Sequence, residues 1–320
     1  MLAKRVESAA IFGPLLVLLT LLDGFPKLQG LPLLVIAVAV GALGTEEAAR
    51  LMRARSERRS PDAAASVEGG GKRPQKPDTE GAGVAQRDLY PPLWLGGCAG
   101  ALPPLFLYFW KRADYEDWVL LILTLAIVFA VLTGSLAVIS DVARRKLWAL
   151  RDSVVVGLAG VYVGGLISSL LFLRRLGDKS LVPWGCWVAL LAFGATWAAD
   201  IGAYFGGKAW GRRALWKRVS PGKTVEGSVV GAAACGLLML AAYGIGLRKF
   251  VSAPTAFVTG LALGVVGLGG DLAESRFKRW AEAKDSGALI PGHGGVLDRF
   301  DSLLWVGPVL YFLIRAWIGS

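Results

Sequence analysis

Long apolar runs recur along almost the whole of this chain and restrict it to one kind of fold. Because the hydrocarbon core of a bilayer is about 30 Å thick, a helix that spans it needs roughly 20 mostly apolar residues. Nine stretches approach this length, at about 8–23, 31–49, 92–110, 117–140, 152–173, 183–205, 226–247, 253–272 and 301–318. The hydrophobic fraction of 54% and the mean hydropathy of +0.53 also exceed those of an average soluble domain. The sequence therefore predicts an all-α, polytopic integral membrane protein with about nine transmembrane helices.

The basic residues divide unevenly between the two sides that nine spans define. The N-terminus and the loops after even-numbered spans carry 26 of the 35 Lys and Arg residues, and the opposite side carries nine. The positive-inside rule places the richer side in the cytoplasm. We therefore expect a cytoplasmic N-terminus and a multi-pass protein of the inner (plasma) membrane. The net charge of +11 does not indicate nucleic-acid binding, because the basic residues lie between apolar runs and form no continuous stripe.

The segment from Ser56 to Arg87 differs from the rest of the chain. It contains no Leu, Ile, Phe, Tyr or Trp, and it includes three prolines and the run Gly69-Gly70-Gly71. Such a segment cannot bury enough apolar surface to order itself. It predicts a flexible cytoplasmic linker, and a tether for lipid headgroups or a partner is the functional alternative.

Three polar clusters follow Thr196, at residues 197–208, 220–227 and 269–301. All of them border the predicted cytoplasmic side. Acids, several fixed cations and a glycine-rich loop suit polyphosphate chemistry, because Mg²⁺ takes one or two protein carboxylates and leaves room for phosphate oxygens. Lys and Arg neutralise the remaining phosphate charge. The candidate functional residues are Asp200, Ser220, Lys223, Thr224, Glu226, Asp271, Ser275, Lys278, Arg279, Lys284, Asp285, His293, Asp298, Arg299 and Asp301.

The third cluster has the spacing of helical faces. Asp271, Ser275 and Lys278 share one face of a helix, and Asp298 and Asp301 share another if that stretch is helical. A carboxylate in the membrane core costs about 2.5–3.5 kcal/mol on insertion scales, so such acids are usually paired or face a polar cavity. The acids of this cluster agree with two interpretations: salt bridges at a membrane edge, or a ligand-binding site. The glycines around the single histidine favour the ligand site, since they let the backbone approach a ligand closely.

The third cluster resembles the signature of phosphatidate cytidylyltransferases. The resemblance extends over about 196–304 and is carried by Ser275-Arg-Phe-Lys278-Arg279, by Lys284-Asp285-Ser-Gly and by Pro291-Gly-His293-Gly-Gly-Val-Leu-Asp298-Arg299-Phe-Asp301. The segments beginning at Asp200 and Ser220 are also similar to that family. The 56–87 insertion is a departure that puts no catalytic residue in doubt.

The resemblance implies a membrane enzyme, a homodimer, that transfers CMP from CTP to phosphatidic acid. It implies that Asp271 and Asp298 hold the catalytic metal, Mg²⁺, with a second metal ion as an alternative. From the need to neutralise phosphate charge, we further expect Lys278 and Lys284 to act in catalysis. The remaining candidates would bind or orient the substrates. We accordingly expect N-terminal transmembrane helices at 1–55, a linker at 56–90, central transmembrane helices at 91–195 and a catalytic transmembrane domain at 196–320, with its active site facing the cytoplasm.

Two other functions agree with parts of the pattern. A CTP-dependent kinase of polyprenols or other lipids would transfer the γ-phosphoryl group and release CDP, so its product distinguishes it. An ion-coupled transporter would use the membrane carboxylates as a relay, and such proteins often show inverted repeats. No repeat is visible in this sequence, and its polar residues crowd one end of the chain.

Overall fold

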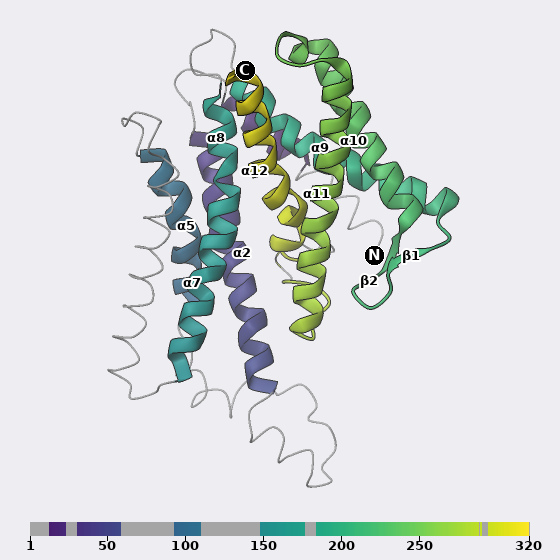
Figure 1. Ribbon diagram of the computed structural model, residues 1–320. Coiled ribbons are helices and arrows are strands. Elements are labelled where there is room, and N and C mark those ends of the chain that lie inside the picture. Colours follow the sequence, from purple (N-terminus) through teal and green to yellow (C-terminus); the bar gives the residue numbers. More distant parts are fainter. Residues whose placement is uncertain are drawn as a thin grey trace.

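The structure is a computed structural model, and it is described here for residues 13–23, 31–58, 93–109, 148–176, 184–287, 289 and 294–319. It is mostly helical (Figure 1). A short apolar helix covers Gly13–Leu22. The other elements are α2 (Leu31–Arg58), α5 (Leu93–Phe109), α7 (Trp148–Ile167), α8 (Ser169–Arg175), α9 (Trp184–Trp210), β1 (Ala214–Trp216), β2 (Ser220–Thr224), α10 (Val225–Ile245), the 3₁₀ turn η2 (Leu247–Lys249), α11 (Ala253–Trp280) and α12 (Leu297–Gly319).

Six helices in the described part of the chain are long and apolar enough to cross a membrane. They are α2, α7 continued by α8, α9, α10, α11 and α12. The predicted spans at 8–23 and 92–110 correspond to the shorter helices Gly13–Leu22 and α5, and the predicted span at 117–140 lies outside the described residues. The protein is thus a multi-pass membrane protein, and the number of nine spans stays a prediction.

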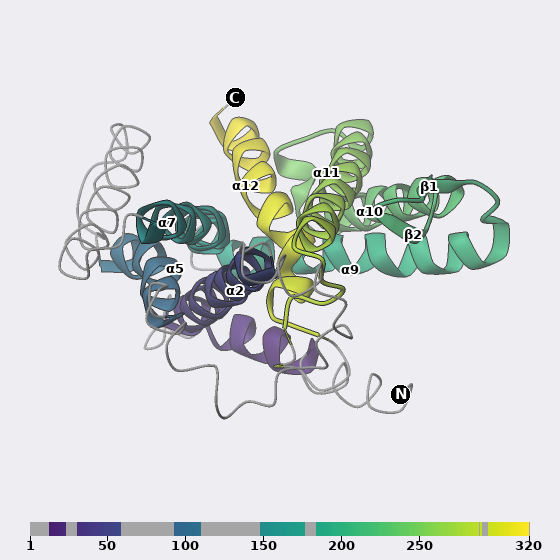
Figure 2. The same cartoon turned by 90° about the horizontal axis from the view of Figure 1, so that it is seen from below.

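The helices form two groups with α12 between them. Helices α2, α5 and α7 pack together on one side, and α9, α10 and α11 pack together on the other (Figure 2). Helix α12 contacts both groups, through α2, α7 and α8 on one side and α9 and α11 on the other. The buried core runs through the same contacts and includes Leu33, Val163, Leu263 and Leu304.

Small residues allow the first group to pack closely. A Cβ atom at Gly100 of α5 would overlap the carbonyl group of Gly41 in α2, and one at Gly164 of α7 would overlap the carbonyl of Gly100. Since lipid tails are as apolar as Leu, helices in a bilayer associate through such close van der Waals packing. These glycines therefore set the distance between the three helices.

A buried ion pair ties the first short helix to the bundle. The Arg174 Nε atom lies 2.5 Å from Asp23 Oδ2, and the two side chains are 7% and 0% exposed. The other oxygen of Asp23 accepts a hydrogen bond from the Leu33 N–H at the start of α2. Asp23 thereby joins the Gly13–Leu22 helix to α2 and α8.

A two-stranded hairpin is the one departure from helical structure in the described residues, and the sequence did not predict it. Strands β1 and β2 pair antiparallel, with Ala214 opposite Thr224 and Trp216 opposite Ser220. Glu226 closes its base by accepting hydrogen bonds from the backbone N–H groups of Arg212 and Arg213, each at 3.1 Å. Thr224 then caps α10, because its hydroxyl accepts the Gly227 N–H at 3.1 Å.

Candidate active site

Helices α11 and α12 bring three carboxylates together at the centre of the site. Helix α11 continues past the predicted span end at residue 272 to Trp280, so Asp271 and Glu274 lie on successive turns of it. Asp301 comes from the first turns of α12. Ligand oxygens of these three side chains all lie within 4.8 Å of one another. The cluster is assembled by contact between the two helices.

Glu274 is a buried acid of this cluster with a single charged partner among the described residues. Glu274 is 7% exposed, and apart from its ion pair with Lys278 neither of its carboxylate oxygens accepts a hydrogen bond from a described residue. Its nearest positive charge is Lys278 Nζ, 2.7 Å from Oε2. A buried carboxylate without hydrogen bonds is costly unless a charge compensates it. Three acid side chains with oxygens facing one another fit a hard divalent cation such as Mg²⁺.

Lys278 links this cluster to Asp298. Its ammonium group lies 2.6 Å from Asp298 Oδ1, while it also contacts Glu274. The other oxygen of Asp298 accepts the backbone N–H groups of Ser286 at 2.9 Å and Gly295 at 2.8 Å. Asp298 is therefore held from three sides, and the metal-binding role expected for it stays a prediction.

The hairpin supplies a second cation to the cluster. Lys223 of β2 pairs with Asp271 Oδ2, and the Ser275 hydroxyl donates to Asp271 Oδ1 at 3.2 Å. The hairpin is held against α11 by Arg279, whose Nε–H donates to the carbonyl of the buried Val219 at 3.3 Å. Lys223 and Ser275, which lie on different elements, thereby bind the same carboxylate, that of Asp271.

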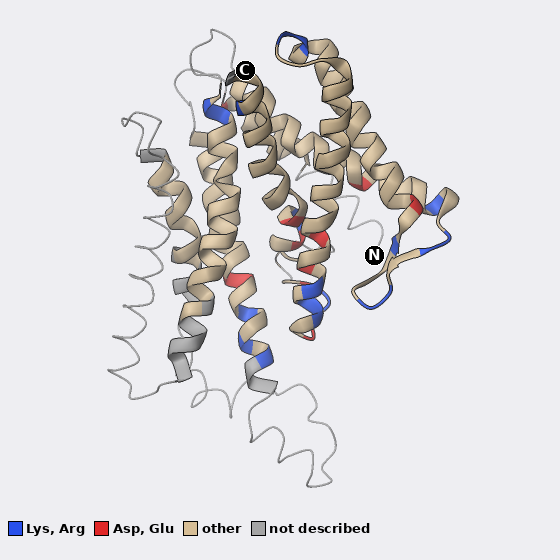
Figure 3. Cartoon of the chain, viewed as in Figure 1, with Lys and Arg blue, Asp and Glu red and all other residues tan. Residues whose placement is uncertain are grey.

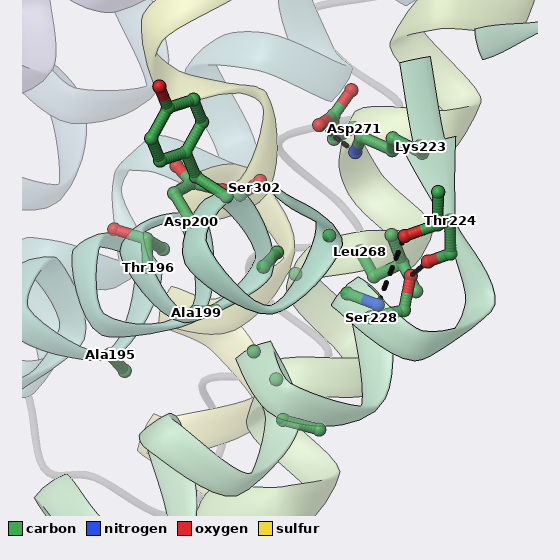
Figure 4. Close-up of a pocket in the computed structure, with 18 of the residues that line it drawn as sticks. Ala195, Thr196, Ala199, Asp200, Lys223, Thr224, Ser228, Leu268, Asp271 and Ser302 are labelled. Atoms are coloured by element: carbon green, nitrogen blue, oxygen red, sulfur yellow. Dashed lines mark hydrogen bonds and ion pairs between the residues drawn. The ribbon is translucent and has the colours of Figure 1, made fainter. Parts of the chain in front are cut away.

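A cavity of about 460 Å³ opens beside Lys223 and Asp271, with charged and hydroxyl side chains at one part of its wall. Figure 4 shows Thr196 and Asp200 from α9 on one side of it, Lys223 and Thr224 on the other, and Asp271 behind them. Small residues of α9, α10 and α11 form much of the remaining wall. This volume is typical of a small-ligand site.

A second cavity, of about 610 Å³, lies on the other side of Asp200. Most of its lining is apolar, and the Gly13–Leu22 helix and α2 contribute residues such as Leu15, Leu19 and Ile36. Its polar end consists of Asp200, Asp298, Arg299, Asp301 and Ser302. Three residues line both cavities: Thr196, Asp200 and Ser302. The cavities thus meet beside the acid cluster.

The predicted site residues fall into three sets. Those around the acid cluster or its two cavities are Asp200, Lys223, Thr224, Asp271, Ser275, Lys278, Asp298, Arg299 and Asp301. Those whose contacts shape the hairpin or the turn after α11 are Ser220, Glu226 and Arg279. Lys284 and Asp285 are exposed in that turn, and His293 lies outside the described residues.

Sequence reasoning missed Glu274, Thr196 and Ser302. Glu274 was detectable, because it lies three residues after Asp271 and therefore near it on the same helix. Thr196 and Ser302 carry no signal of this kind, since a single hydroxyl within an apolar run is common. Their position between the two cavities depends on how α9 packs against α12.

Comparison with known proteins identifies the family to which the chain belongs. A protein from Synechocystis sp. (strain ATCC 27184 / PCC 6803 / Kazusa), named phosphatidate cytidylyltransferase, is 38% identical over 209 residues, which are 58% of this chain and 70% of that protein. Proteins of the same name from Bacillus subtilis (strain 168) and Brucella suis biovar 1 (strain 1330) are 40% and 43% identical over 49% and 48% of this chain. These alignments span 56% and 54% of those two relatives. Since the cytidylyltransferase family model matches residues 84–317, which is most of the chain, this protein belongs to the cytidylyltransferase family.

Proposed function

We propose that this enzyme transfers CMP from CTP to phosphatidic acid, forming CDP-diacylglycerol and pyrophosphate. The observation that carries the proposal is the pair of cavities that meet at Thr196, Asp200 and Ser302, beside the acid cluster. One cavity contains Lys223, Lys208 and several hydroxyl groups among small apolar residues, which suits a nucleoside triphosphate. The other is largely apolar with a polar end, as a phospholipid requires. The relatives' name is consistent with this pair of substrates.

The reaction joins two anions and needs no general base. The phosphate monoester of the lipid has a second pKa of about 6 and is largely ionised at neutral pH. One of its oxygens bonds to the α-phosphorus of CTP, and the bond from that phosphorus to the bridging oxygen breaks, so pyrophosphate leaves with that oxygen. The obstacle is repulsion between the anions. Catalysis should therefore depend on charge neutralisation and in-line positioning.

Different side chains of the site would bind the phosphates, orient them and hold the metal ion. Lys223 and Lys278 would each exchange a carboxylate contact for a phosphate oxygen when CTP enters, since a lysine is a mobile point charge. Thr196, Asp200 and Ser302 would orient the reacting phosphates where the cavities meet. Asp271, Glu274 and Asp301 would hold Mg²⁺, with Asp298 as the fourth acid, and a second ion would fit the same set. When bound, Mg²⁺ supplies charge neutralisation for the CTP phosphates and the departing pyrophosphate.

The charge distribution favours a cytoplasmic site. Lys and Arg gather at one end of the bundle, on the C-terminal ends of α2 and α11 and on the hairpin, and the acids of α11 and α12 lie next to that end (Figure 3). The positive-inside rule assigns such an end to the cytoplasm, where CTP is made available. On this basis we infer an inner-membrane enzyme with a cytoplasmic N-terminus, a catalytic domain at 196–320, and helices at 1–55 and 91–195 that complete the lipid side. The linker at 56–90, the nine spans and the homodimer remain predictions from the sequence.

The product of the reaction tests the proposal. Purified protein in detergent would be given CTP labelled at the α-phosphate, phosphatidic acid and Mg²⁺. We expect the label in a CDP-lipid, together with one pyrophosphate per product, and no product from Asp271→Asn. Label recovered as CDP, with phosphorylation of an added polyprenol, would instead identify a lipid kinase and refute the proposal.

A further inference from the structure

Glu47 of α2 contacts the loop between α11 and α12, whose residues Ser286 and Gly295 donate hydrogen bonds to Asp298. Its carboxylate accepts the backbone N–H of Val296 on Oε1 at 2.8 Å and that of Leu297 on Oε2 at 2.9 Å. Oε2 also accepts the Ser286 hydroxyl at 2.8 Å. Glu47 is 6% exposed, and its partners lie 239 to 250 positions away along the chain. It is thus bound to both ends of the segment between α11 and α12.

Two glycines make this approach possible. A Cβ atom at Gly287 would lie 2.7 Å from Glu47 Oε1, and one at Gly295 would overlap the Glu47 carboxylate and the Ser286 hydroxyl. A side chain at either position would displace the Glu47 carboxylate or the Ser286 hydroxyl from where it now lies. The loop is therefore in close contact with the acid itself, as well as joined to it by hydrogen bonds.

The partners of Glu47 are also the partners of Asp298. Ser286 donates its N–H to Asp298 Oδ2, and its hydroxyl lies 3.0 Å from the same oxygen. Because that hydroxyl has one hydrogen, it can donate to Glu47 or to Asp298, but not to both at once. Gly295, next to the Glu47-bound Val296, donates its own N–H to Asp298 Oδ2. Any shift of Glu47 would thus move the groups that fix Asp298.

A carboxylate suits this position better than an amide. In the described part of the chain all three groups that face Glu47 are donors, and two of them are N–H groups at the N-terminus of α12, where a negative charge is stabilised. A glutamine in either orientation would turn its NH₂ group toward a backbone N–H. The side chain would then have to move away from at least one of these partners.

We propose that Glu47 is a positioning residue for catalysis: by binding Ser286, Val296 and Leu297 it keeps Asp298 and Lys278 in place beside the acid cluster. The proposal rests on the proposed function. Glu47 lies outside residues 84–317, which match the family model, so the N-terminal helices contribute to the site and not only to the membrane anchor.

The isosteric variant Glu47→Gln tests this role against a matched control. Glu46→Gln makes the same chemical change one residue away, where the side chain pairs with the exposed Arg50. For Glu47→Gln we expect kcat to fall about 10- to 100-fold, as for the loss of groups that orient metal ligands. The KM for phosphatidic acid should change little, and the Mg²⁺ concentration for half-maximal rate should rise. Glu46→Gln should match the wild type in all three.

Two further measurements separate positioning from simple stability. Amide hydrogen exchange of peptides covering 294–300 should be faster in Glu47→Gln and unchanged in Glu46→Gln, whether or not the protein is active. Should Glu47→Gln not fold, Gly287→Ala provides the same displacement without removing the charge, and Gly165→Ala, whose Cβ meets nothing within 4 Å, is its control. We expect Gly287→Ala alone to lower kcat.

The outcomes distinguish the two proposals. A wild type that makes no CDP-lipid refutes the proposed function, while the exchange data still report the contact between Glu47 and the loop. A wild type that is active together with a folded Glu47→Gln of normal kcat and normal Mg²⁺ dependence overturns the positioning role alone. A loss of activity that only follows the fraction of folded protein overturns it as well.

Discussion

Replacing Lys278 by Met should destabilise the protein through the acids that this lysine neutralises. Its ammonium group lies 2.7 Å from Glu274 and 2.6 Å from Asp298, and the side chains of these three residues are 13%, 6% and 6% exposed. Methionine keeps an unbranched apolar side chain of similar length and removes the ammonium group with its charge and its donors. The variant therefore isolates the electrostatic contribution of one group.

The magnitude follows from burial. Removing one partner of a buried ion pair costs about 3–5 kcal/mol, because the remaining charge stays desolvated. We take the lower limit of about 3 kcal/mol, since the nearby cavities admit water and ions. At about 2–4 °C for each kcal/mol, the midpoint of thermal unfolding should fall by about 6–12 °C.

Thermal unfolding in detergent with a chelator present measures this directly. Lys284→Met is the matched control, because Lys284 is exposed in the turn after α11, and its unfolding midpoint should stay near that of the wild type. The double variant Lys278→Met with Glu274→Gln should recover part of the loss, since it removes one of the two uncompensated acids. Added Mg²⁺ should stabilise Lys278→Met more than the wild type. An unchanged midpoint for Lys278→Met would refute the view that the lysine neutralises this cluster.

Three other predictions test separate parts of the structure. Asp298→Asn should abolish CDP-lipid formation in the labelled-CTP assay while membrane insertion stays intact, and near-normal turnover would refute its predicted role at the metal. Gly100→Leu would force a side chain into the carbonyl of Gly41 and should cost about 3 kcal/mol, the upper end of the usual range for overpacking, seen as a lower yield of folded protein and a lower unfolding midpoint. Arg174→Met leaves the fully buried Asp23 without its ion pair and should cost about 3–5 kcal/mol in thermal unfolding, with normal activity for each folded molecule.

The helices and their order could be read from the sequence because a membrane span is set by local composition. The runs at 31–49, 183–205, 226–247 and 253–272 all correspond to long apolar helices in the structure. Their ends were less predictable, since polar residues at a membrane edge can continue a helix. Helix α11 extends to Trp280 for this reason, and that extension is what places Lys278 in the site.

The choice of carboxylates was harder to predict. The sequence spacing placed Asp271 with Ser275 and Lys278 on one face, and the structure has the same arrangement along α11. Spacing within one helix, however, says nothing about the distance to another helix. Contact between α11 and α12 brings Asp301 to Asp271 and Glu274, while Asp298 is bound by Lys278 and two backbone N–H groups.

By itself, the sequence determined the membrane fold, the polar end of the chain and the family signature, because hydropathy, charge bias and motif spacing are properties of neighbouring residues. Only the tertiary structure decided that Glu47 binds the loop before α12, that the hairpin sends Lys223 to Asp271, and that two cavities share Thr196, Asp200 and Ser302. These contacts join residues far apart in the chain. They depend on how whole helices pack, which no local pattern specifies.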